Sequence, residues 1–167
     1  MKPFVSIRSI MAASVALMGL MAGAALANYD REAVQATLRD LHRHQAELSA
    51  LAAERIERDA VVELANTLER DHAVLDAWLA EADVEASAAD SPTTLGDHEA
   101  YAALQEEEGE GFETAYLAYQ EQLLRAAIDY LERQRPDAVE ELTEFDNHLK
   151  VTRESLRKNL ALVESLR

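Results

Sequence analysis

His72 is the residue of this sequence with the clearest capacity for chemistry. Glu69 precedes it by three residues, the spacing at which bundle helices present a carboxylate and an imidazole to one metal ion. His72 also falls between Leu68 and Leu75, in an apolar stripe with helical spacing. A ring buried there needs a hydrogen-bond partner, because an unpaired buried polar group costs about 1–3 kcal/mol. Two interpretations therefore stay open: a structural core histidine bonded to a carboxylate or backbone carbonyl, and a metal ligand.

A metal ion at His72 would need ligands from a second helix. His148 stands on the flank of the last apolar stripe, with Glu144 one helical turn before it. The candidate metal ligands are therefore His72, His148, Glu69, Asp71 and Glu144. Nitrogen and oxygen ligands of this kind suit iron, manganese, zinc or copper. A complete di-metal centre requires inward carboxylates on more helices, so we expect at most a loosely bound divalent metal, and the fold requires no cofactor.

The other histidines have weaker claims to a role. His44 lies on the flank of the first predicted helix, His42 points away from the stripe of that helix, and His98 lies in a linker region. We expect His42 and His98 to be solvated. The sequence shows no nucleophile–base pair, phosphate loop or dinucleotide fingerprint, and it has no cysteine for thiol chemistry. We therefore expect a non-catalytic protein.

The first 27 residues have the layout of a secretory signal peptide. Lys2 and Arg8 form a positive start, and the uncharged stretch 9–27 that follows ends in the small-x-small sequence Ala-Leu-Ala. The alternative is an uncleaved membrane anchor, but the stretch is short and diluted with Ala and Gly. We expect residues 1–27 to be a cleaved signal peptide, residues 28–167 to form one domain, and the protein to be periplasmic or extracellular, with outer-membrane association left open.

Composition narrows the classes of partner. The 167 residues carry 16 Lys and Arg against 32 Asp and Glu, a net charge of -16. Loss of residues 1–27 would leave 14 basic against 32 acidic side chains, a net charge of -18. Phosphates and anionic lipids would be repelled by such a surface, which argues against nucleic acid and anionic membranes as partners.

Hydrophobic periodicity predicts helices throughout the mature chain. Apolar residues recur at steps of three, four and seven, and they define four long helices, over 30–58, 60–82, 112–134 and 136–167. Asp59 is the expected N-cap of the second helix. The first two helices join closely and should form an antiparallel hairpin. Asp97 should cap a short helix in the long connection that follows, and Gly109 and Gly111 should interrupt the chain before the third helix.

The third helix is apolar on two faces. Such a helix is deeply buried or also forms an interface, and a homo-oligomer or a protein partner bound through it is the expected interaction. Pro136 fits the first turn of the fourth helix. The predicted fold class is all-α, an up-down four-helix bundle with a long connection between its second and third helices.

Four segments, in this order, resemble one bacterial family. They are Ala52–Ala65, Glu69–His72, Gly111–Leu117 and Leu142–Leu149. The chain resembles, over roughly 41–160, the ferritin-like secreted proteins known as domain of unknown function 4142. The resemblance implies a ferritin-like bundle in the periplasm or outer membrane, and no settled activity.

The match departs at two positions of the third helix. Glu113 stands where the family prefers Asp, and Leu124 falls where many members carry a histidine. If that histidine helps to bind metal in the family, this chain lacks one ligand. The predicted function is an exported, non-catalytic bundle in envelope or stress-related interaction; the alternative is a metal-binding ferritin-like protein that uses His72, His148 and neighbouring carboxylates.

Overall fold

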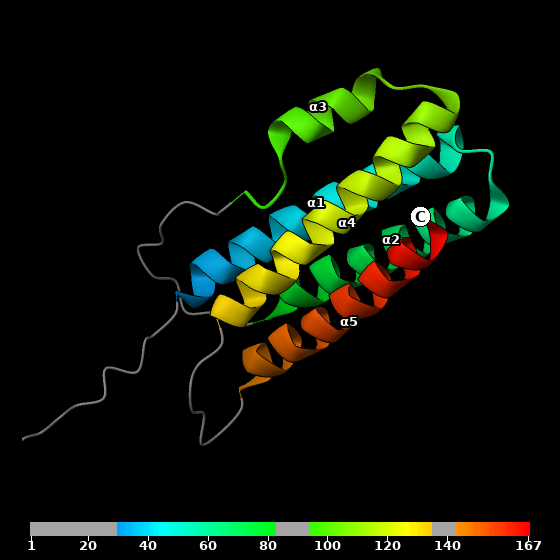
Figure 1. Cartoon of the computed structure of the whole chain (residues 1–167). Helices are drawn as coiled ribbons and strands as arrows, with labels where there is room; N and C mark the ends of the chain where they lie inside the picture. The colour runs from blue at the N-terminus through cyan, green and yellow to red at the C-terminus, as the bar shows by residue number, and fades with distance from the viewer. Residues whose placement is uncertain (1–29, 83–93, 135–142) are drawn as a thin grey trace, which may run out of the picture.

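Every regular element of the described residues is an α-helix. The computed structural model describes residues 30–82, 94–134 and 143–167. In order, the helices are α1 (Arg31–Arg55), α2 (Asp59–Glu81), α3 (His98–Glu106), α4 (Gly109–Arg133) and α5 (Glu144–Leu166). The four long helices run side by side, and the short α3 lies on the outside, against α4 (Figure 1). The predicted all-α class is confirmed, while the predicted signal peptide lies outside the described residues.

The helices α1 and α2 form the antiparallel hairpin that the sequence predicts. Arg39 Nε lies 2.9 Å from Asp76 Oδ1, and Gln35 Nε2 donates to the Leu79 carbonyl over 2.6 Å. The predicted N-cap is wrong by one residue, because Arg58 has the extended backbone of the cap position and Asp59 is already helical. A carboxylate in the first turn still favours the helix through the macrodipole.

The helix α3 begins at its predicted cap. The Asp97 side chain accepts hydrogen bonds from the backbone N–H groups of Glu99 and Ala100. The start of α4 was predicted too late, since the helix begins at Gly109 and both glycines lie in its first turn. Gly109 has φ +55°, a left-handed conformation that glycine adopts without a steric penalty, so the chain turns into α4 there and not at Phe112.

The helix α5 begins later than predicted. Thr143 has extended backbone and accepts a hydrogen bond from the Asp146 N–H, while the Asp146 carboxylate accepts from the Thr143 N–H. This reciprocal capping box fixes a helix start, so a helix that continues through residue 143 is excluded. The prediction for Pro136 falls outside the described residues.

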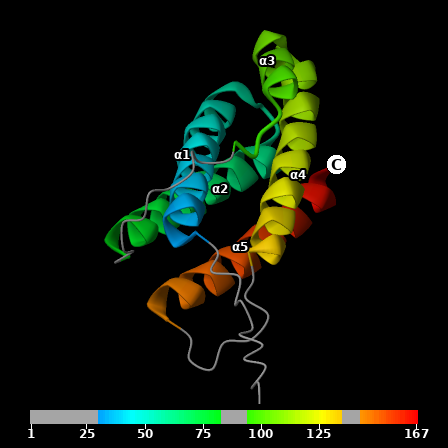
Figure 2. The same ribbon diagram turned by 90° about the vertical axis from the view of Figure 1, so that its left-hand side faces the viewer.

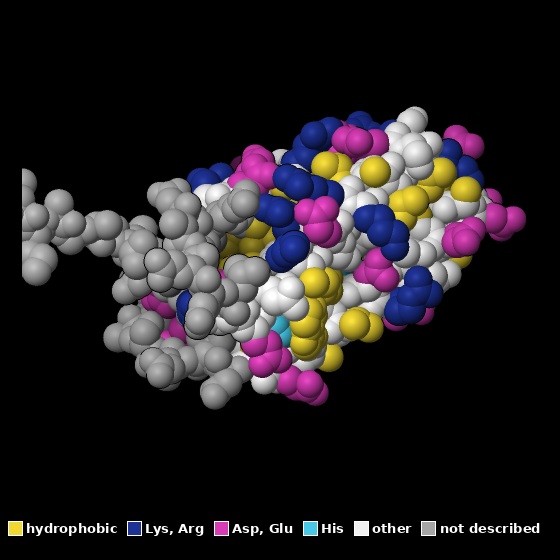
Figure 3. Space-filling model, turned by 90° about the horizontal axis from the view of Figure 1, so that it is seen from below, with side chains coloured by type: hydrophobic (Ala, Val, Ile, Leu, Met, Phe, Trp, Pro, Cys, Tyr) yellow, Lys and Arg dark blue, Asp and Glu magenta, His cyan; other side chains and the backbone are white. Residues whose placement is uncertain are grey.

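The helices α4 and α5 are joined across their exposed edges by ion pairs. Arg125 pairs with Glu164 at 2.5 Å and Arg157 with Glu132 at 2.7 Å. Basic and acidic side chains are interspersed on this side of the molecule, with hydrophobic groups between them (Figure 3). The helix α5 is inclined to α4, so that its N-terminal half extends toward the C-terminal half of α2 (Figure 2).

Buried side chains fill the space between the four long helices. Both apolar faces of α4 are buried, as predicted, including Tyr116, Leu123, Leu124 and Leu131. None of the helices in the described ranges has the length and apolar character needed to cross a membrane.

Candidate functional site

The interior contains a pair of histidines on neighbouring helices. His42 on α1 and His72 on α2 are both 0% exposed, and their Nδ1 atoms lie 2.8 Å apart. One ring must donate its Nδ1 proton and the other accept it, so the two neutral rings hold opposite tautomers. Both Nε2 atoms lack a hydrogen-bond partner among the described residues.

Burial keeps this pair uncharged near neutral pH. It lowers the pKa of His42 to about 3. It also lowers the pKa of His72 well below the usual 6.5, with the proximity of His42 as the second cause. The desolvation of a charged imidazole explains both shifts.

His72 is buried, as its place in the leucine stripe predicts, but its partner is another histidine and not a carboxylate or a carbonyl. The prediction that His42 is solvated is wrong. The buried face of α1 is wider than its apolar stripe, because α1 packs against both α2 and α4, and the wider face includes His42.

His148 is also buried, at 0% exposed, although the sequence placed it on the flank of its stripe. Its ring packs against Trp78 of α2, with ring centroids 3.4 Å apart. Burial lowers the pKa of His148, and the negative charge of Glu144 opposes that shift. Within the described ranges, neither ring nitrogen of His148 has a hydrogen-bond partner.

The carboxylates of the candidate metal set lie nearer to solvent. Glu69 and Glu144 are exposed, and Asp71 is half-buried with Arg70 3.9 Å away. No hydrogen bond, ion pair or ring contact between described residues joins His72 to His148. Likewise, no three His, Asp or Glu side chains of the described part of the chain group together as metal ligands would.

A second polar cluster joins α1 to α4. The hydroxyl groups of Ser49 and Tyr116 lie 3.1 Å apart, and Gln120 Nε2 lies 3.5 Å from Ser49 Oγ. Burial raises the pKa of Tyr116 to about 12, so the hydroxyl stays protonated. Hydrophobic periodicity could not reveal this cluster, because two of its members are polar residues at core positions.

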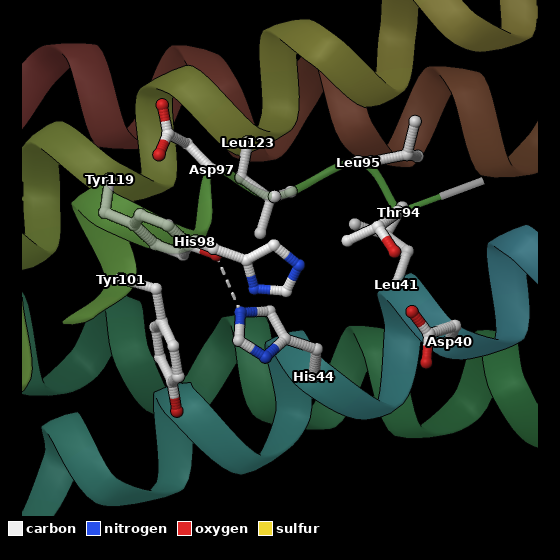
Figure 4. A pocket seen from close by; sticks show the side chains of 11 residues that line it. Asp40, Leu41, His44, Thr94, Leu95, Asp97, His98, Tyr101, Tyr119 and Leu123 are labelled. Atoms are coloured by element: carbon white, nitrogen blue, oxygen red, sulfur yellow. Dashed lines mark hydrogen bonds between the residues drawn. The ribbon is translucent and has the colours of Figure 1, made fainter.

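A pocket of about 350 Å³ opens between α1, α3 and α4 (Figure 4). Its described lining combines imidazole, phenol, carboxylate and apolar groups, from Asp40, Leu41, His44, Thr94, Leu95, Gly96, Asp97, His98, Tyr101, Tyr119 and Leu123. His98 is exposed, which confirms the prediction for that residue. His98 and His44 both line the pocket, from α3 and from α1 (Figure 4).

Three aromatic rings build one wall of this pocket. His44 Nε2 lies 2.9 Å from the Tyr119 hydroxyl oxygen. The His44 ring meets Tyr101 edge-on at 4.7 Å between centroids and Tyr119 edge-on at 5.8 Å. Edge-to-face packing of this kind is the favoured geometry for aromatic rings, so the three rings hold one another in place.

The hydrogen bond between His44 and Tyr119 joins two uncharged groups. Burial raises the pKa of Tyr119 to about 12, so the hydroxyl stays protonated. Burial lowers the pKa of His44 from 6.5, against the opposing charges of Asp40 and Glu47. At neutral pH the imidazole is therefore uncharged, and its tautomer decides whether Nε2 accepts from the Tyr119 hydroxyl or donates to it.

Sequence reasoning did not find this pocket. His44 and Tyr119 were placed on separate helices, and Tyr101 carried no signal of its own. The long connection before α3 brings Tyr101 beside them, and no periodic pattern in the sequence fixes where that connection leads.

Comparison with known proteins identifies the family of this chain. A family model described as Domain of unknown function (DUF4142) matches residues 16–166. No curated protein and no solved structure matches the chain. Since the family model spans nearly all of the sequence, the chain belongs to the DUF4142 family.

Proposed function

We propose that this chain is an exported, non-catalytic protein with a ferritin-like bundle, which acts by binding a ligand in the pocket between α1, α3 and α4. The observation that carries the proposal is the pocket itself, whose volume of about 350 Å³ falls in the range of small-molecule sites. Its lining combines apolar side chains with a few polar groups that converge on one space, the usual composition of a ligand site.

The side chains of the aromatic wall favour binding over chemistry. His44 Nε2 and the Tyr119 hydroxyl are each other's hydrogen-bond partner, and Tyr101 packs against both rings. A wall of groups that are already paired presents a fixed surface, and such preorganisation reduces the ordering cost of binding.

The ferritin-like assignment rests on the arrangement of helix pairs. Helices that are neighbours in the sequence pack together as two pairs, α1 with α2 and α4 with α5. The two pairs meet where α2 packs against α5 and where α1 packs against α4. A long connection, from Ala82 to Glu108, separates the two pairs and contains α3. Ferritin-like bundles likewise have one long crossover between helix pairs.

Export rests on the N-terminal sequence and can be tested by mass. The intact mass of protein recovered from the periplasmic fraction should correspond to a chain that begins at Asn28. A full-length mass in the membrane fraction would contradict cleavage, and a full-length mass in the cytoplasm would contradict export.

Ligand binding can be tested with a variant that disturbs the pocket wall. A Cβ added at Gly96 would lie 2.6 Å from the Tyr119 hydroxyl oxygen, so Gly96→Ala forces Tyr119 or the backbone at residue 96 to shift and changes the shape of the pocket wall. In a fragment screen observed by protein NMR, fragments that shift the His44 and Tyr101 signals of the wild type should lose affinity for Gly96→Ala.

Ala102→Leu is the matched control, because Ala102 is an exposed residue of α3 outside the pocket lining. It should bind the same fragments as the wild type. A screen without hits at the pocket, or equal binding by Gly96→Ala, would contradict the proposed binding function.

A second candidate is metal binding through His72 and His148, with Glu69, Asp71 or Glu144. The observation that favours it is the set of buried ring nitrogens without a partner among the described residues: His72 Nε2, and both nitrogens of His148. A buried polar atom without a partner calls for an explanation, and an ion is one such explanation.

Calorimetry of metal-free protein with zinc or manganese tests this candidate. Loss of binding in both His72→Ala and His148→Ala, with full binding retained by the exposed-site variant His98→Gln, would establish it. The exposed positions of Glu69 and Glu144 lead us to expect loose binding and little thermal stabilisation at stoichiometric metal, because stabilisation follows metal concentration over dissociation constant.

A further inference from the structure

We propose that the pocket between α1, α3 and α4 binds a small organic cation of the quaternary ammonium type. This inference rests on the proposed binding function and adds the chemical class of the ligand. Two observations carry it: the aromatic wall on one side of the pocket, and the carboxylates at its rim.

The aromatic wall places two tyrosine rings at the surface of the pocket. Tyr101 and Tyr119 both line the pocket, with ring centroids 5.6 Å apart and planes inclined by 41°. Aromatic faces attract organic ammonium groups through their quadrupole, and quaternary ammonium ions are the ligands most often recognised in this way. His44 packs against both rings from α1 and shares a hydrogen bond with the Tyr119 hydroxyl, so the wall is fixed before any ligand enters.

The charges around the pocket are negative. Asp40 and Asp97 line it from α1 and from the start of α3, and its described lining includes no Lys or Arg. Hydrogen bonds from the backbone of Ala100 and Glu99 lower the pKa of Asp97, so this carboxylate is ionised at neutral pH. Together with the net charge of -16, these groups attract cations and oppose anions.

Figure 4 shows how these groups are distributed. Asp40 and the aromatic group of Tyr101, Tyr119 and His44 lie on different sides of the space, with Leu95 and Leu123 along it. Apolar and aromatic surfaces suit the methyl groups of a quaternary ammonium ion, and the rim carboxylates suit its charge. A hydrated metal ion would gain nothing from the apolar surfaces, which favours the organic cation.

The test compares two ligands of the same shape. Choline and 3,3-dimethyl-1-butanol differ in the charge of the central atom, and calorimetry of the mature protein measures both. Choline should bind at least about 10-fold more tightly, because only the charged ligand gains the cation–π and carboxylate interactions. Added salt should weaken the binding of choline but not of the neutral alcohol, since the carboxylates that attract the charge are exposed.

Variants assign the binding to the pocket. Tyr101→Leu should weaken choline binding about 3- to 30-fold, whereas Tyr101→Phe keeps the ring and should bind as the wild type does. Asp97→Asn retains a good N-cap for α3 and should weaken binding about 3- to 6-fold. Asp129→Asn, an exposed change on α4 outside the pocket lining, makes the same charge change and should leave binding unchanged.

The outcomes separate the ligand class from the binding function. Equal binding of choline and the neutral alcohol, both lost in Tyr101→Leu, would overturn the cation and leave the pocket as a binding site. Binding of calcium without choline would also overturn the organic cation. No binding of either ligand, together with an empty fragment screen, would contradict both proposals.

Discussion

The paired histidines of the interior lead to a prediction with two independent readouts. Replacement of His42 by leucine removes the partner of His72 Nδ1 and leaves a buried polar atom unpaired. We expect His42→Leu to lower the free energy of unfolding by about 1–3 kcal/mol at pH 8. In the double variant His42→Leu, His72→Leu neither polar ring remains, so its stability should return to within about 1 kcal/mol of the wild type. The two substitutions should therefore be strongly non-additive.

The second readout is the pH dependence of stability. The pKa of His42 is lowered to about 3 and that of His72 well below 6.5 in the folded protein, whereas both titrate near 6.5 in an unfolded chain. Below pH 6.5 the unfolded state binds more protons, so the stability present above pH 6.5 is lost as the pH falls. When the pH falls from 8 to 5.5, each of the two histidines should lower the free energy of unfolding by about 1.4 kcal/mol, and the pair by about 2.8 kcal/mol.

Urea unfolding at pH 8, 6.5 and 5.5 measures both effects in one series. The wild type should lose about 2.8 kcal/mol more than the double variant over this range, and each single variant about 1.4 kcal/mol more. His98→Gln, which removes an exposed histidine, is the control and should match the wild type at pH 8. Strictly additive single substitutions, or a double variant that loses as much stability between pH 8 and pH 5.5 as the wild type, would refute the reasoning from a buried neutral pair; the acid dependence that remains in the double variant comes from groups such as His44 and His148, whose pKa values burial also lowers.

Three further predictions concern other contacts. Thr143→Ala removes the capping box of α5 and should lower the free energy of unfolding by about 0.5–2 kcal/mol. The backbone amides at the start of α5 should also lose protection in hydrogen exchange, whereas Thr143→Ser should retain most of the stability and protection of the wild type. Tyr116→Phe removes the hydroxyl that pairs with Ser49 and should lower the free energy of unfolding, measured in urea, by about 0.5–1.5 kcal/mol; a loss in the double variant with Ser49→Ala that equals or exceeds the sum of the two single losses would argue against a shared bond. Glu164→Gln breaks the surface pair with Arg125 and should cost less than about 1 kcal/mol, vanishing in high salt.

Apolar periodicity predicted the helices well, because a helix in a bundle must bury one stripe. Leu68, Leu75 and Leu79 define that stripe in α2, and all three are buried. The hairpin of α1 and α2 followed from the short join between them. Thr143 and Asp146 stand at the spacing of a capping box, which marks the start of α5. The prediction placed the start earlier because Pro136 also suits the first turn of a helix, where its missing N–H costs nothing.

Polar residues at core positions set the limit of that reasoning. His42, Gln45 and Ser49 are buried on α1, yet a pattern that counts apolar residues assigns them to the surface. A polar side chain becomes a core residue through a partner on another helix, as His42 does through His72, and the pairing depends on tertiary structure. His148 is buried because Trp78 of α2 covers its ring, and that contact too depends on tertiary structure.

The polar pairs also explain how a bundle of similar helices holds one alignment. His42–His72 joins α1 to α2, and Ser49–Tyr116 joins α1 to α4. Leucine contacts are non-directional and tolerate a shift of one helical turn, whereas such a shift would leave the buried hydroxyl and imidazole groups unpaired, at about 1–3 kcal/mol each.

The alignment of α1 with α4 matters at the pocket. Its wall depends on His44 of α1 meeting Tyr119 of α4, and both residues lie within about two helical turns of Ser49 and Tyr116 along their helices. The buried Ser49–Tyr116 pair therefore holds α1 and α4 at the separation at which His44 and Tyr119 meet. The helix α3 then adds Tyr101 to these two rings. Interior polarity and the binding surface are in this way two consequences of one alignment of α1 with α4.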